Sequence, residues 1–350
     1  MTSWAQANRS AVAMASEIHG DLEIDLDRPV DVFGAIQQLG IVLAFRPLGR
    51  VSGVYVPGNP SSGILLHEGH PRTRQRYSAG HELGHHAFGH AAEIDLEPDV
   101  GLQRAVDERW PSHEKEAEAF AAWFLMPRRL LRSGLAHLGL DAPRDPYDVY
   151  ALSLWLGTSY TATARQLAVT RIVDSRRADE WSSIPPANLK KALAGEMVPN
   201  DLRNDVWWLD ARHHMQPVDT RPGDRLIVTL PEIPSSGFSW RFTSMPEQMR
   251  LLSDSYSDHW EPDFAIEAKE TPQKSDPESA GSGPDRSFAL EVSAEAERGV
   301  EHLALVKEQS WEKEEGQEEF ELLISINPPL HGIQLSEEQL TMPTSGGEAV

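Results

Sequence analysis

Two histidines and a glutamate near residue 80 have the types and spacing that peptide hydrolysis at a metal ion requires. The segment reads His81-Glu82-Leu83-Gly84-His85. Residues four apart lie on one face of an α-helix, so His81 and His85 can direct both imidazoles to one zinc ion. Glu82 lies about 100° around the helix from His81, where it can reach a water beside the ion without being a ligand. The pattern therefore predicts a zinc peptidase helix with Glu82 as the catalytic base.

The same pattern can also arise by chance in a histidine-rich helix, because the chain contains 14 histidines. Two histidines do not complete a catalytic zinc site, which takes three protein ligands and keeps one position for water. The rest of the chain therefore has to supply a third ligand and a surface that binds a substrate.

The composition restricts the classes of function that remain. With 350 residues and 40% hydrophobic residues, the chain can form two or three domains with separate cores. It has no cysteine, so disulfides and thiolate ligands are excluded. The sequence has neither an apolar run of membrane-spanning length nor a signal-peptide pattern at its start, and we expect a cytoplasmic protein without membrane association. The net charge of −22 disfavours a nucleic-acid-binding surface and favours a basic protein partner.

The elements around the histidine pair follow from the spacing of apolar residues. A helix over residues 114–126 begins with Glu114, Glu116 and Glu118 and is apolar on most sides from Ala117 onward. Glutamates in a first helical turn are usually solvated, but a buried helix can direct its acidic end at a partner. Further helices are predicted over residues 3–19, 30–39, 147–156 and 161–168, and strands over residues 41–45, 51–56 and 63–67.

A resemblance connects the two helices. Arg76-Tyr77-Ser78-Ala79-Gly80, the His-Glu-Leu-Gly-His segment, and Glu-x-x-Ala-x-x-Phe-Ala-x-x-Phe-Leu-Met-Pro starting at residue 114 resemble the ImmA/IrrE family of metallopeptidases. The similarity covers about residues 25–170 and implies a zincin-like domain with a helical part and a Zn²⁺ cofactor.

The resemblance also implies roles for further residues. The third zinc ligand maps onto Glu114, with Glu116 as the alternative. Glu118 stands where members of the family usually carry Asn or Asp, and we expect it to contact a ligand from the second shell, as we expect of His90. The implied substrate is a transcriptional repressor, cleaved in a stress or mobile-element response.

The texture changes after residue 216 to short β-prone runs separated by turn residues, which is typical of a β-sandwich. The segment Leu-Pro-Glu-Ile-Pro-Ser-Ser-Gly-Phe-Ser-Trp at residues 230–240 resembles the Pro-Thr-Thr-Gly-Tyr-x-Trp loop of chagasin-like cysteine-peptidase inhibitors. The similarity covers about residues 217–328 and implies an immunoglobulin-like sandwich. The implied binding loops contain Pro234, Ser235, Ser236, Gly237, Phe238 and Trp311.

The inhibitor resemblance is incomplete and leaves two uses for the sandwich. The family's Asn-Pro is Ile233-Pro234 here, and its Arg-Pro is Gln309-Ser310. The sandwich can therefore capture a papain-like cysteine peptidase, or it can bind other proteins and cover the peptidase cleft.

The sequence as a whole predicts an α+β protein. Its parts are a metallopeptidase domain over residues 1–170, a helical or irregular connector over 171–216, an all-β sandwich over 217–330 and a disordered tail over 331–350. The predicted activity is zinc-dependent endopeptidase cleavage of a protein substrate. A binding protein for a cysteine peptidase is the alternative, and a DNA-binding helix-turn-helix over residues 147–168 with Arg165 is a third reading.

Overall fold

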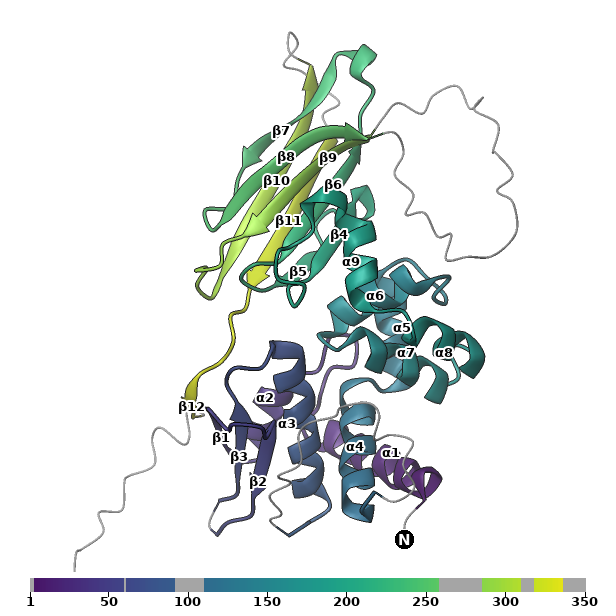
Figure 1. The fold of residues 1–350 in the computed structure, drawn as a ribbon, viewed down its shortest axis with the longest axis vertical. Coiled ribbons are helices and arrows are strands. Elements are labelled where there is room, and N and C mark those ends of the chain that lie inside the picture. Colours follow the sequence, from purple (N-terminus) through teal and green to yellow (C-terminus); the bar gives the residue numbers. More distant parts are fainter. Residues whose placement is uncertain (1–2, 60, 92–109, 258–284, 310–317, 336–350) are drawn as a thin grey trace, which may run out of the picture. The chain divides into compact units, whose positions relative to one another are not determined.

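The computed structural model describes residues 3–59, 61–91, 110–257, 285–309 and 318–335 and combines helices with sheets (Figure 1). The chain forms two compact units. Unit 1 consists of Met1–Pro143, Trp155–Ser182 and Pro329–Val350, and unit 2 of Arg144–Leu154 and Ser183–Pro328. The predicted mixture of helix and sheet, with a β-rich C-terminal region, is confirmed. Among the described residues, none of the helices combines the length and the apolar character that crossing a membrane takes.

Unit 1 combines helices with one four-stranded sheet, which α2 and α3 contact. The histidine pair lies on α3, which contacts strands β2 and β3 as well as helix α4. The helices of this unit are α1 (Trp4–Asp21), α2 (Val32–Gln38), α3 (Arg72–Ala87), α4 (Ser112–Leu125), α5 (Arg128–His137), α7 (Tyr160–Val169) and α8 (Ser175–Ser182), and its strands are β1 (Val42–Arg46), β2 (Gly53–Val56), β3 (Gly63–His67) and β12 (Gly332–Gln334).

The sheet of unit 1 has the strand order β12-β1-β3-β2. Strand β3 runs parallel to β1 and antiparallel to β2, so β2 forms one edge of the sheet. The core beneath it consists of apolar side chains that face the helices, including Leu43, Phe45, Ile64 and Leu66. Figure 1 shows α3 between this sheet and α4, with α1 behind α4. Helix α3 therefore has one face on the sheet and the other on α4.

The other edge of this sheet is a strand that the sequence did not predict. Gly332–Gln334 pairs antiparallel with Phe45, Ala44 and Leu43, although residues 331–350 were predicted to be a disordered tail. The prediction is wrong for these three residues, because backbone pairing with β1 supplies order that their local composition does not indicate. The rest of the predicted tail, from residue 336, lies outside the described residues.

Unit 2 contains two four-stranded sheets with the orders β5-β11-β10-β7 and β4-β6-β9-β8. From Phe320 to Ile326, strand β11 alternates buried side chains with less buried ones, as expected of a strand with one face in a core. The elements of this unit include α6 (Pro146–Leu156), whose last two residues belong to unit 1, α9 (Pro186–Ala194), β4 (Val206–Asp210), β5 (Pro217–Thr220), β6 (Arg225–Pro231), β7 (Phe238–Ser244), β8 (Met249–Ser257), β9 (Asp285–Val292), β10 (Gly299–Gln309) and β11 (Glu318–Ile326).

One apolar core lies between the two sheets of unit 2. Leu226, Leu290 and Phe288 come from one sheet, and Leu305 and Phe320 come from the other. Each is at most 1% exposed, so the two sheets bury their inner faces against each other. The predicted sandwich architecture follows from this shared core.

The first strand of this core corrects the predicted connector. The sequence predicts a helical or irregular segment over residues 171–216, but Val206–Asp210 within it forms β4 and pairs parallel with β6. Val206 and Leu209 are buried in the sandwich, and so is Trp207. Burial of these apolar side chains outweighs the turn-forming residues that precede them in the sequence.

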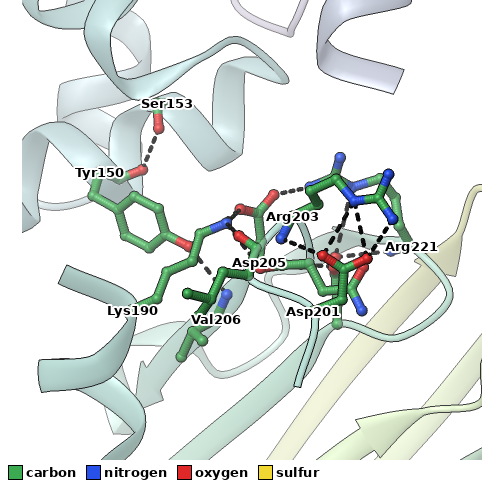
Figure 2. A network of polar contacts seen from close by, with 11 residues as sticks. Tyr150, Ser153, Lys190, Asp201, Arg203, Asp205, Val206 and Arg221 are labelled. Atoms are coloured by element: carbon green, nitrogen blue, oxygen red, sulfur yellow. Dashed lines mark hydrogen bonds and ion pairs between the residues drawn. The ribbon is translucent and has the colours of Figure 1, made fainter. Parts of the chain in front are cut away.

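A buried network of charges holds the start of β4 (Figure 2). The Lys190 ammonium lies 2.7 Å from a carboxylate oxygen of Asp205, which also pairs with Arg221. Tyr150 donates its hydroxyl hydrogen to Asp205 and accepts the backbone N–H of Val206. Burial lowers the pKa of Lys190 to about 8. The network links α6, α9 and the start of β4 through Tyr150, Lys190 and Asp205. Separating these elements would leave a buried charge unpaired, which is strongly unfavourable.

Candidate functional site

Helices α3 and α4 approach each other along a seam of small residues. A Cβ added at Gly84 would lie 2.9 Å from the Ala117 Cα, and one added at Gly80 would lie 3.4 Å from the Ala121 Cα. A side chain larger than hydrogen at Gly84 would therefore meet the backbone of α4. Because the helices are this close, the acidic end of α4 reaches the histidines of α3.

Three side chains converge at the end of this seam. The Nε2 atoms of His81 and His85 lie 3.1 Å apart. Glu114 places Oε2 at 3.2 Å from the His81 Nε2 and Oε1 at 3.4 Å from the His85 Nε2. In the part of the chain that the structure describes, these three residues are the one group of His, Asp and Glu side chains arranged to hold a metal ion.

The spacing of these atoms fits a tetrahedral ion. Two ligands about 2.05 Å from a zinc ion and at the tetrahedral angle lie about 3.3 Å apart. The two Nε2 atoms are 3.1 Å apart, and the nearest Glu114 oxygen is Oε2 for His81, at 3.2 Å, and Oε1 for His85, at 3.4 Å. Both histidines present the same ring nitrogen to one point. The donor set of two imidazoles and one carboxylate is one that catalytic zinc sites use.

His81 is held from behind by a carboxylate and a phenol. Its Nδ1 lies 3.3 Å from Glu118 Oε2, and the hydroxyl of Tyr77 donates to Glu118 Oε1 at 2.8 Å. An imidazole that coordinates through Nε2 carries its hydrogen on Nδ1, where Glu118 accepts it. Glu118 thus lies beside a candidate ligand, and Tyr77 donates a hydrogen bond to its carboxylate.

His85 has a corresponding chain of contacts. Its Nδ1 lies 3.0 Å from the Nδ1 of His90, whose Nε2 is 3.4 Å from Glu116 Oε2. Glu116, the alternative third ligand, thus contacts His90 while Glu114 faces the two candidate ligands. The Nδ1 atoms of His81 and His85 thus each have a polar partner, Glu118 and His90. Glu118 in turn contacts Tyr77, and His90 contacts Glu116.

Burial and neighbouring charges shift the pKa values of the three residues. Burial disfavours the charged form of His81, but its hydrogen bonds with Glu114 and Glu118 outweigh burial and raise its pKa well above the usual range. Burial and the charge of His81 lower the pKa of His85 to about 3. Burial opposes ionisation of Glu114, yet the hydrogen bond from His81 lowers its pKa to about 2. A cation that displaces the His81 proton meets two imidazole lone pairs and a carboxylate, so binding releases a proton.

Glu82 lies on the side of α3 that faces the sheet. Its side chain is buried, and a Cβ added at Gly53 on β2 would be 2.7 Å from Glu82 Oε1. The negative charge of Glu82 is near enough to His81 to raise the pKa of that imidazole. Glu82 is therefore adjacent to the candidate ligands without belonging to their cluster.

Arg165, the basic residue of the predicted helix-turn-helix reading, lies on α7 in unit 1. It is half-buried, and its charge lowers the pKa of the Tyr77 phenol, although burial and Glu118 raise that pKa overall.

Most of the predicted binding loop in unit 2 is visible between β6 and β7. Pro234–Ser236 forms a short 3-10 turn, and Gly237 has a φ of +79° before β7 begins at Phe238. Ser235 and Ser236 are exposed. Trp311 lies outside the described residues.

A buried glutamate fixes the loop at its base. Glu232 is 1% exposed, and its carboxylate accepts the backbone N–H of Trp240 at 2.8 Å. The Trp240 indole donates to the carbonyl of Pro231 at 3.1 Å, and Arg286 lies 3.4 Å from Glu232. The two ends of the loop are thus tied together, which lowers the entropy cost of binding a partner.

Tyr77, Gly53 and Gly84 are the residues that the sequence analysis did not assign. Tyr77 precedes His81 by four residues, a spacing that puts it on the ligand face of α3 and that marks it in the sequence. The two glycines carry no such signal, because their roles depend on which element packs against them.

Comparison with protein-family models identified a domain in each half of the chain. Residues 36–142 match a peptidase family described as an IrrE N-terminal-like domain, and residues 219–326 match the chagasin family of peptidase inhibitors. Both resemblances drawn from the motifs are confirmed. A search of curated proteins found no match.

Solved structures similar to the chain include a cysteine protease inhibitor, EhICP2, from Entamoeba histolytica (17% identity, 35% of this chain and 96% of that chain, TM-score 0.28). Amebosin matches with 15% identity over 35% of this chain and 98% of its own, with a TM-score of 0.25. PbICP-C, solved in complex with falcipain-2, matches with 12% identity over 35% and 92%, with a TM-score of 0.19. TM-scores this low carry no argument about fold or function.

The family match at residues 36–142 and the side-chain cluster on α3 and α4 both indicate a metal-dependent peptidase domain. The first domain indicates a metallopeptidase of the IrrE family, and three of its side chains are arranged to bind a metal ion. The second indicates a protein-binding regulatory domain. Residues 36–142 thus resemble an IrrE-type peptidase domain, and residues 219–326 resemble a chagasin-type inhibitor domain.

Proposed function

We propose that the chain is a zinc-dependent endopeptidase with a zincin-like catalytic domain, in which His81, His85 and Glu114 hold the ion. The observation that carries the proposal is the convergence of the two Nε2 atoms, 3.1 Å apart on the helix that also bears Glu82, with the Glu114 carboxylate, whose two oxygens lie 3.2 and 3.4 Å from them. The family match at residues 36–142 supports peptide-bond hydrolysis as the reaction.

The chain's own residues supply the proton transfers. A bound zinc ion provides a Lewis acid for the scissile carbonyl and lowers the pKa of water. Glu82 accepts the proton of the attacking water and returns it to the leaving amine nitrogen. Glu118 and His90 keep the two imidazoles in the orientation that exposes Nε2.

Metal dependence is the direct test of this proposal. Full-length protein is incubated with a proteome-derived peptide library, and cleavage is read by mass spectrometry. We expect cleavage to stop after treatment with a chelator and to return when about one equivalent of Zn²⁺ is added. Cleavage that survives removal of the metal, confirmed by elemental analysis, would reject a metallopeptidase.

The physiological substrate is proposed to be a protein, with a transcriptional repressor cut in a stress or mobile-element response as the first candidate. The sequence resemblance to the ImmA/IrrE family motivates this choice. Proteins that bind an inactive Glu82→Gln variant are recovered and identified to test this choice. Recovery of proteins other than transcriptional repressors would reject the repressor as the substrate.

A second candidate function belongs to the sandwich, for which we propose an immunoglobulin-like fold. The loop tied at Glu232 and Trp240 is pre-ordered and displays Ser235 and Ser236, which suits capture of a papain-like cysteine peptidase. The family match at residues 219–326 supports this binding role.

Papain provides the measurement for the second candidate. We expect full-length protein carrying Glu82→Gln to slow papain's hydrolysis of a small fluorogenic peptide. Gly237→Val is the control, because a β-branched residue at a φ of +79° is strained and distorts the loop. An unchanged papain rate with excess protein would leave the sandwich as a binding domain for other proteins.

A further inference from the structure

Strand β2 has a glycine at the point where it passes the carboxylate of Glu82. A Cβ built on Gly53 would lie 2.7 Å from Glu82 Oε1, 2.9 Å from its Cγ and 3.2 Å from its Cδ. All three separations are shorter than ordinary van der Waals contact between these atoms, which begins near about 3.4 Å. The position of the Glu82 side chain therefore depends on the absence of a side chain at residue 53.

The strand cannot move away to make room. Gly53 pairs with Leu66 on β3, and the backbone N–H of His67 donates to the carbonyl of Ser52 at 2.9 Å. The guanidinium of Arg74, on α3, donates to the Ser52 hydroxyl at 3.3 Å. The start of β2 is thus bonded both to its neighbouring strand and to the helix that carries Glu82.

The helix cannot move away either. Residues two apart on an α-helix lie about 200° apart around its axis, so Glu82 faces the sheet while Gly80 and Gly84 face α4. A Cβ at Gly84 would already be 2.9 Å from the Ala117 Cα. A shift of α3 away from β2 would push Gly84 closer to the backbone of α4. A methyl group at residue 53 therefore has to be accommodated by a movement of the Glu82 side chain.

We propose that Gly53 is a positioning residue for catalysis: its missing side chain sets the place of the Glu82 carboxylate beside the candidate metal ligands. The inference rests on the proposed function, in which Glu82 is the base. Gly53 is not among the described glycines with positive φ, so alanine fits its backbone and the steric effect can be isolated.

Crystal structures of the wild-type chain and of Gly53→Ala test the positioning directly. We expect the Glu82 carboxylate to be displaced in the variant while His81, His85 and Glu114 keep their positions. The thermal midpoint should change little, because alanine at a compatible φ lowers the entropy of the unfolded chain, which offsets the cost of moving the flexible Glu82 side chain. A Glu82 carboxylate that stays in its wild-type position overturns the inference, whatever the rates show.

The kinetic test uses one peptide from the library that the wild type cleaves. We expect Gly53→Ala to lower kcat about 10- to 100-fold with metal content and KM unchanged. In the Glu82→Gln background the same substitution should have no further effect, because the base is already absent. Gly63→Ala on β3 is the matched control, since its Cβ would meet only the Val42 carbonyl at 3.7 Å.

The outcomes separate the two claims. Equal cleavage by the wild type and by Glu82→Gln overturns the proposed role of Glu82 and with it the catalytic part of the inference. Loss of cleavage in Glu82→Gln together with wild-type kcat in Gly53→Ala overturns the inference alone. A fall in kcat that is additive with Glu82→Gln shows that Gly53 acts by another route and also overturns it.

Discussion

Glu82→Gln should lower the rate of peptide cleavage by about 10²- to 10⁴-fold, the range that a positioned general base contributes. Glutamine keeps the size of the side chain and its fit beside Gly53, but its amide cannot accept a proton. Zinc content should stay at the wild-type level, because Glu82 is not in the cluster of ligand atoms. The rate is measured on a cleaved library peptide, with metal content determined on the same sample.

Glu118→Gln is the matched control for that change. It removes the charge of a carboxylate 3.3 Å from the His81 Nδ1, so it weakens the hold on a ligand and leaves the base in place. Loss of such a partner costs about 10- to 100-fold in metal affinity, and we expect added Zn²⁺ to restore its rate. If added Zn²⁺ also restores Glu82→Gln, then Glu82 serves metal binding and its assignment as the base is wrong.

The spacing of residues along each helix was the part of the site that could be predicted from the sequence. Residues four apart share a helix face, and this places Tyr77, His81 and His85 together on α3 and Glu114 with Glu118 on α4. Such spacing depends only on local helix geometry. The structure brings these two faces within hydrogen-bond distance.

The choice between Glu114 and Glu116 could not be made from the residues alone. Both lie near the start of α4, and which of them faces α3 depends on the rotation of one helix against the other. That rotation is set by the contact of Gly84 with Ala117, a packing detail with no local signature. Resemblance to a family pointed to Glu114, and the geometry gives the physical reason.

Strands β4 and β12 escaped prediction for a related reason. β12 has three residues and pairs with β1, so its order comes from residues almost the full length of the chain away. β4 follows turn-forming residues and becomes a strand because Val206 and Leu209 fill the sandwich core beside β6. In both cases long-range pairing decides the conformation, and periodicity within the segment carries little information.

Glu114→Ala should abolish stoichiometric zinc binding. The substitution removes one of the three ligand atoms and leaves His81 and His85, whose Nε2 atoms lie 3.1 Å apart, as the remaining donors. The loss of affinity should exceed the roughly 10- to 100-fold that removing a partner of a ligand costs. Zinc affinity is measured by competition with a chromophoric chelator, and fold is monitored by circular dichroism.

Glu116→Ala tests the alternative ligand on the same helix turn. Glu116 lies 3.4 Å from the Nε2 of His90, whose Nδ1 contacts His85. Its removal should therefore weaken zinc binding by no more than the partner range of about 10- to 100-fold and leave one zinc per chain at saturation. Stoichiometric zinc in Glu114→Ala together with its loss in Glu116→Ala would exchange the two roles. It would also mean that α4 rotates when the ion binds, because the Gly84–Ala117 contact now directs Glu114 at the histidines.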